Sequence, residues 1–149
     1  MTTENLRKEI FIESSPETLF SFFIDPDKMN RWMGRNVLLE PKIGGKYRID
    51  INGENVAIGE YTEIVENEKV VMTWGWKDSD IMPPGSTTVE FLLIPQHEGT
   101  LLVLNHYDIP VEKVPSNHKG WTHYMERIKC LGQGEDLGVD PWSGDNINI

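Results

Sequence analysis

The longest amphipathic pattern in the chain lies near its C-terminal end and limits the folds that the chain can adopt. Beginning near Ser116, Trp121, Met125 and Ile128 follow one another at intervals of four and three residues. This spacing aligns side chains on one face of an α-helix. A single long helix with one apolar face needs a surface to cover it, so the rest of the chain must supply a sheet or further helices.

The middle of the chain supplies that surface as strands. Apolar side chains recur at every second position, which places them on one face of a strand. The four runs are Tyr47, Ile49 and Ile51; Val70, Met72, Trp74 and Trp76; Val89, Phe91 and Leu93; and Leu102, Leu104 and His106. Turns are expected at 66–69 and 96–99. Strands that follow each other through short turns favour an antiparallel sheet.

The first part of the chain predicts one strand followed by two short helices. Alternating side chains indicate a strand at 8–14. Ser15 can cap the first helix, and Pro16 suits its first turn, where a missing N–H costs nothing. Pro26 ends that helix because the residue before a proline avoids the α region. A second helix is expected at about 27–32. The chain therefore predicts an α+β protein in which a curved sheet grips one long helix.

The composition restricts location and partners. The 149 residues, which suggest one domain, include 14 Lys and Arg and 24 Asp and Glu, for a net charge of −10. Such a chain repels phosphate backbones and anionic lipid headgroups, so we expect no nucleic-acid partner and no membrane association. Cys130 is the single cysteine, which excludes an intramolecular disulfide. The first residues contain no apolar signal-peptide region, so a cytoplasmic location is expected.

Five segments, in order, resemble a known family. They are SPETLFSFFIDPDKMNRW, IGGKY, GEYTEIVENEKVVMTW, STTVEFLLIPQHEGTLLVLNH and GWTHYMERI. Together they cover about 8–135 and resemble the SRPBCC (START/Bet v 1-like) superfamily, more narrowly its AHSA1-like branch, related to the activator of Hsp90 ATPase. The resemblance implies a helix-grip fold: a curved antiparallel sheet of about six to seven strands around the C-terminal helix. It also implies a single domain at 1–135. The segment at 136–149 has acidic residues and no Lys or Arg, so an acidic, loosely held extension is expected there.

The resemblance does not select one activity, because this fold hosts several functions. Members include hydrophobic-ligand binders, polyketide cyclase-like enzymes and co-chaperone domains. What they share is a cavity between the concave face of the sheet and the last helix. The residues that face this cavity therefore become the candidate site.

Motifs of known catalytic and cofactor sites are missing from the chain. GGKY lacks the first glycine and the final Ser or Thr of a P-loop, and no GxSxG, HExxH, CxxC or EF-hand pattern occurs. His118 and His123 would lie about 140° apart around a helix, which prevents them from sharing a metal ion. Cys130 is interpreted as a small packing residue. We therefore expect no cofactor, no metal site and no assigned catalytic residue.

His106 has two interpretations that the sequence leaves open. It follows Leu102 and Leu104 on the strand face that is expected to meet the helix. A histidine there can bond a ligand or transfer a proton. Alternatively, it is a core histidine bonded to a neighbouring backbone group or tyrosine.

The aromatic and methionine side chains give the main functional signal. Residues of these types surround pockets that bind apolar ligands, although they equally fill ordinary cores. The candidate ligand-binding residues are Trp32, Tyr47, Met72, Trp74, Trp76, Phe91, Leu104, His106, Trp121, Tyr124 and Met125.

Three functions follow as hypotheses. The leading one is a monomeric or homodimeric binding protein whose partner is a small apolar or amphipathic ligand, more a binder than an enzyme. The second is an Hsp90 co-chaperone-like module, implied by the resemblance, with a chaperone or other protein partner and a role in the stress response. The third is a cyclase- or hydrolase-like enzyme that uses His106 with a cavity carboxylate.

Overall fold

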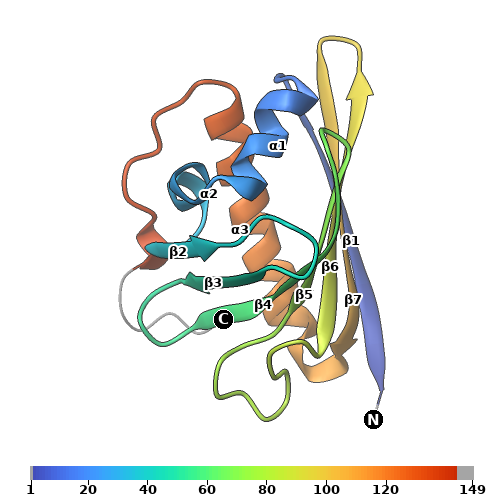
Figure 1. Ribbon diagram of the computed structural model, residues 1–149, viewed down its shortest axis with the longest axis vertical. Helices are drawn as coiled ribbons and strands as arrows, with labels where there is room; N and C mark the ends of the chain where they lie inside the picture. Colours follow the sequence, from blue (N-terminus) through green and yellow to red (C-terminus); the bar gives the residue numbers. More distant parts are fainter. Residues whose placement is uncertain (1, 144–149) are drawn as a thin grey trace.

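A seven-stranded antiparallel sheet curves around one long helix in the computed structural model, which describes residues 2–143 (Figure 1). The strands are β1 (Thr3–Ile12), β2 (Asn36–Leu39), β3 (Lys46–Asp50), β4 (Val56–Val65), β5 (Lys69–Trp74), β6 (Thr87–Gln96) and β7 (Gly99–Pro110). The helices are α1 (Pro16–Ile24), α2 (Pro26–Trp32) and α3 (Val114–Gly132), with 3-10 turns η1 (Val111–Lys113) and η2 (Pro141–Ser143). The strand order is β1-β7-β6-β5-β4-β3-β2. The predicted fold class, a helix-grip α+β fold, is confirmed.

Two side-chain caps fix the helical pair that follows β1. The Ser15 hydroxyl accepts a hydrogen bond from the Thr18 backbone N–H at 3.1 Å and begins α1. The Asp25 N–H donates to the Ser21 carbonyl at 3.1 Å and closes α1. The Asp25 carboxylate then accepts from the backbone N–H of Asp27 at 2.9 Å and begins α2. One aspartate therefore ends α1 and caps α2, and aspartate is among the residues preferred at the N-cap of a helix.

Two predicted boundaries differ from the structure. The first strand begins at Thr3, whereas the sequence predicted 8–14, because β1 pairs with β7 as far as the Thr3–Pro110 pair. Pairing across the sheet sets this start, and local alternation does not reveal it. The last helix begins at Val114, two residues earlier than predicted, with Pro115 in its first turn. Proline is tolerated there because the first N–H groups of a helix have no intrahelical partner.

The core lies between the concave face of the sheet and α3, and α1 and α2 cover one end of it (Figure 1). The predicted stripe of Trp121, Met125 and Ile128 is buried there together with Tyr124. Trp32 closes the α1–α2 end, where its indole N–H donates to the Phe22 carbonyl at 3.0 Å. Within the described residues, no helix is both long and apolar enough to cross a membrane.

The segment after α3 returns along the helix surface. It leaves the end of α3 and runs past α2 toward β2 (Figure 1). The sequence predicted a loosely held extension, yet Asp140 is buried and Trp142 packs against the core. The composition shows that this segment is acidic, but it does not show that side chains of α3 bind Asp140. The last six residues, 144–149, lie outside the described part of the chain.

Candidate ligand-binding cavity

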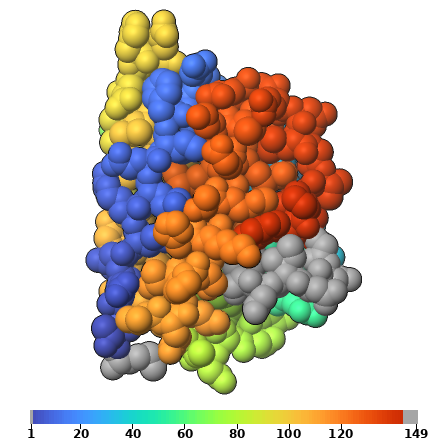
Figure 2. Space-filling view, turned by 180° about the vertical axis from the view of Figure 1, so that it is seen from behind, coloured from blue at the N-terminus to red at the C-terminus, as the bar shows by residue number. Residues whose placement is uncertain are grey.

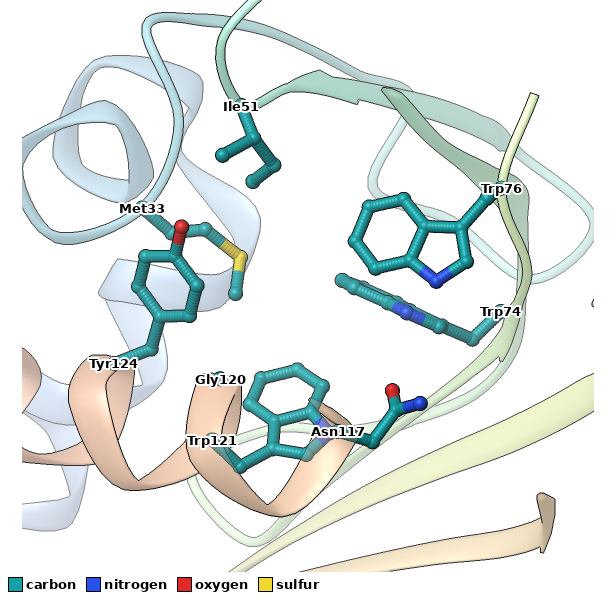
Figure 3. Close-up of a pocket in the computed structure, with 8 residues that line it drawn as sticks. All are labelled: Met33, Ile51, Trp74, Trp76, Asn117, Gly120, Trp121 and Tyr124. Carbon is teal, nitrogen blue, oxygen red and sulfur yellow. The ribbon is translucent and has the colours of Figure 1, made fainter. Parts of the chain in front are cut away.

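A small cavity lies between α3, the end of α2 and the sheet (Figure 3). Its lining residues are Met33, Ile51, Trp74, Trp76, Asn117, Gly120, Trp121 and Tyr124. The volume open to the centre of a water-sized sphere is about 10 Å³, which is room for one water molecule. In this conformation the cavity is therefore closed to anything larger than a solvent molecule.

The β5 end of the cavity is shaped by a close backbone approach. Trp74 is the last residue of β5, and Trp76 follows in an isolated bridge to Ala57. Between them, a Cβ on Gly75 would lie 1.9 Å from the Pro83 carbonyl oxygen. Only glycine lets the loop after β5 pass so near. This approach places two indole rings next to each other on one side of the cavity.

The aromatic walls form a connected cluster. Trp74 is at its centre, with ring centroids 5.2 Å from Trp121 and 6.0 Å from Trp76. The Tyr47 ring stacks behind Trp74 at 5.7 Å. These separations lie in the range at which aromatic pairs attract one another beyond simple burial. Packed aromatic rings therefore form the sheet side of the cavity.

Two buried polar atoms of the walls have no hydrogen-bond partner among the described residues. They are the Trp74 indole N–H and the Tyr124 hydroxyl. Figure 3 shows that the two side chains face the cavity from opposite sides. Burial, and next the charge of Asp140, raise the pKa of Tyr124 well above its usual value, so this hydroxyl keeps its proton. An unsatisfied buried polar group costs about 1–3 kcal/mol, which a suitable ligand would recover.

His106 lies behind the cavity wall and both of its ring nitrogens are bonded. Its Nδ1 accepts from the Trp121 indole N–H at 3.0 Å, so the proton resides on Nε2. That nitrogen lies 2.8 Å from the Thr87 hydroxyl, which donates to the Trp74 carbonyl at 2.7 Å. Burial lowers the pKa of His106 to about 3. This neutral histidine holds two cavity walls in place, and the enzymatic hypothesis loses its central residue.

Four of the eleven sequence-predicted site residues line the cavity, namely Trp74, Trp76, Trp121 and Tyr124. The other seven are buried but do not line it: Trp32, Tyr47, Met72, Phe91, Leu104, His106 and Met125. Tyr47, for example, donates its hydroxyl to the Thr73 carbonyl at 2.6 Å. Alternation along a strand identifies which side chains point inward. It does not show which of these side chains line the cavity beside α3.

Four lining residues were not among the predicted candidates: Met33, Ile51, Asn117 and Gly120. Helical spacing contains a signal for two of them. Asn117 and Gly120 lie one helical turn before Trp121 and Tyr124, and residues four apart share a helix face. Met33 follows the last residue of α2, so its position depends on how that helix packs.

A polar cluster lies on the outer side of Tyr124. The His123 Nε2 is 2.9 Å from an Asp140 carboxylate oxygen. The other oxygen of Asp140 has no hydrogen-bond partner among the described residues, and the Arg127 Nε lies 3.9 Å from it. The Trp142 ring stacks on His123 with centroids 4.1 Å apart. The cluster therefore joins the segment after α3 to the helix that carries a cavity wall.

The sheet and the helix that it grips define a helix-grip protein with a small cavity between them. Comparison with known families is more specific. The family described as activator of Hsp90 ATPase homolog 1-like protein matches residues 13–132. The chain belongs to this AHSA1-like family, a branch of the SRPBCC superfamily.

Individual relatives support this assignment. The activator of 90 kDa heat shock protein ATPase homolog 1 from Homo sapiens is 31% identical over 133 residues, which are 87% of this chain and 37% of the human protein. The chain thus spans little more than a third of that relative's length. The solution structure of an AHSA1-like protein from Rhizobium etli is 34% identical, with a TM-score of 0.76 over 99% of this chain and 93% of that one.

A second solved structure shows the same fold at lower identity. The Aha1 dimer from Colwellia psychrerythraea is 16% identical, with a TM-score of 0.77 over 88% of this chain and 97% of that one. Membership of the family supports a ligand-binding or Hsp90-co-chaperone-like module.

Proposed function

We propose that the protein binds a small, mainly apolar molecule in the cavity between α3 and the sheet. The observation that supports this most directly is the pair of unpartnered polar atoms, the Trp74 N–H and the Tyr124 hydroxyl, on mainly apolar walls. Ligand pockets typically combine apolar walls with a few polar groups that fix orientation. Because the Trp74 N–H can only donate, the ligand should carry an oxygen or nitrogen acceptor.

The closed cavity sets a condition on this function. Pockets for drug-sized ligands measure roughly 300–1,000 Å³, whereas this cavity holds about 10 Å³. The ligand must therefore bind an opened state and supply the free energy that opening costs. Met33 directly follows α2, and Tyr124 lies on α3, so both walls can move without breaking strand pairing.

A thermal-shift screen with lipids, flavonoids and aromatic polyketides tests the proposal. Binding of a ligand to the folded state alone raises the melting temperature by mass action. For a compound that binds, Trp74→Phe retains one aromatic ring but removes the pyrrole ring with its N–H donor, so we expect a loss of affinity of about tenfold or more, at least the effect of one hydrogen bond. Tyr47→Phe is the matched control, because its hydroxyl is buried but does not line the cavity.

Two outcomes count against ligand binding in this cavity. One is the absence of a thermal shift with every compound class. The other is a bound compound whose affinity changes equally in Trp74→Phe and Tyr47→Phe, since that compound would occupy another site.

The second candidate function is that of an Hsp90 co-chaperone-like module. It is supported by the 31% identity to the human activator across 87% of this chain. Such a role would place the protein in the cytoplasm and in the stress response. We expect the purified protein to raise the ATPase rate of an Hsp90 from the same cell. An unchanged rate at saturating protein, together with no binding by calorimetry, would exclude this function.

A further inference from the structure

We propose that residues 135–143 form a strap that holds the cavity closed, and that Asp140 and Trp142 are positioning residues acting through Tyr124. This inference rests on the proposed function, because it concerns access to the same cavity. It assigns a task to the segment beyond the matched family region, which ends at residue 132.

The strap is anchored at one place on α3. The Asp140 side chain is 4% exposed and accepts hydrogen bonds from His123 and from the Trp142 backbone N–H, each at 2.9 Å. The Trp142 ring lies flat on His123, with an angle of 7° between the two planes. The Lys119 ammonium lies 5.8 Å from the centroid of the Trp142 ring. A carboxylate and an indole therefore hold the strap against two successive turns of the helix.

The anchored residues contact the cavity wall directly. Tyr124 presents its ring edge-on to His123 at 4.9 Å and to Trp142 at 5.9 Å, while its inner side lines the cavity. Tyr124 thus lies between the strap and the cavity. A movement of this ring toward solvent is blocked while Trp142 occupies its place.

Arg127 extends the same anchor to the second movable wall. Its guanidinium donates to the carbonyls of Trp32 at 3.1 Å and Gly138 at 3.4 Å. Trp32 precedes Met33, which lines the cavity beside Tyr124. One arginine therefore connects the end of α2, helix α3 and the strap, so release of the strap loosens both walls.

The strap is also the part of this region that opens most cheaply. Apart from η2 it makes no regular secondary structure, and Val139 beside Asp140 is 85% exposed. Segments with few buried contacts unfold locally at a small fraction of the global free energy. In Figure 2 the strap lies beside α3, on the side away from β1.

Tryptophan quenching measures this opening without any ligand. Trp142→Ala removes the stack on His123, and Trp142→Phe is the matched control that retains a ring there. Both variants lack the strap indole, so acrylamide quenching reports the remaining buried tryptophans, three of which line the cavity. We expect a quenching constant about twofold higher or more in Trp142→Ala, and the affinity for 1-anilinonaphthalene-8-sulfonate to rise in proportion to the open fraction.

A second variant pair tests the other anchor in the Trp142→Phe background. Asp140→Ala should increase quenching in the same way, whereas Val139→Ala, one residue away and exposed, should not. Near-ultraviolet circular dichroism verifies that each protein keeps its packed core. If Asp140→Ala does not fold, the comparison of Trp142→Ala with Trp142→Phe alone tests whether the strap holds the cavity closed.

The results separate the strap from the ligand. Increased quenching without binding of the dye or of any screened compound supports the strap and refutes the proposed function. Compound binding with equal quenching constants in all variants overturns the strap and leaves the proposed function standing. Equal quenching without binding refutes both.

Discussion

Replacement of Tyr124 by phenylalanine tests the central observation, a buried hydroxyl without a partner. In the structure this hydroxyl is enclosed and unbonded, whereas the Tyr61 hydroxyl donates to the Phe23 carbonyl at 2.8 Å. A net hydrogen bond contributes about 0.5–1.5 kcal/mol, and removal of an unsatisfied polar group relieves its desolvation cost. We therefore expect Tyr61→Phe to lower the free energy of unfolding by about 1 kcal/mol and Tyr124→Phe to leave it unchanged or raise it.

Urea denaturation of the two variants and the parent protein measures the difference. With a slope of about 2 kcal/mol per M, Tyr61→Phe should lower the midpoint by about 0.5 M. Tyr124→Phe should have the parent's midpoint or a higher one. Equal losses in both variants would refute the reasoning, because the Tyr124 hydroxyl would then have a bonding partner in solution, such as a resident water.

Three further predictions follow from the fold. Burial lowers the pKa of His106 to about 3, below its unfolded value of about 6.5, so the unfolded chain takes up the proton first as the pH falls. Stability should therefore drop by about 1 kcal/mol between pH 7.5 and 5.5, with a smaller drop in His106→Gln, measured by urea denaturation. Ser15→Ala removes the cap of α1 and should cost about 1 kcal/mol by the same assay, with Ser15→Asp close to the parent. Gly75→Ala would force a Cβ against the Pro83 carbonyl and should lower the melting temperature by several degrees, whereas Gly85→Ala, which meets no atom within 4 Å, should be milder despite its positive φ.

Local patterns were sufficient for the elements of the fold. The stripe of Trp121, Met125 and Ile128 gave the face of α3 that is buried. Ser15 and Pro26 placed the ends of α1, because caps and prolines act within a few residues. These signals depend only on residues close together in sequence, so they predict the same features that the structure shows.

The cavity depended on relations that no local pattern contains. Trp74 and Met72 lie on the same face of β5, yet only Trp74 lines the cavity. The partners of His106 come from β6 and α3, far from it in sequence. In the sequence, Asp140 is one of several acidic residues in a polar tail. Only the structure shows that His123 and Arg127 lie beside it. Long-range packing decides each of these cases.

The position of β1 at the edge of the sheet has a consequence for how the chain folds. Its neighbour is β7, and pairs such as Arg7–Asn105 join residues 98 apart. Contacts between residues so far apart in sequence form late, because closing the long loop between them costs entropy before the contacts stabilise the chain. On the ribosome, β1 emerges before β7 and must wait for it. Until then β1 is an unpaired segment that other chains can reach, and the rate of translation through β6 and β7 sets how long that exposure lasts.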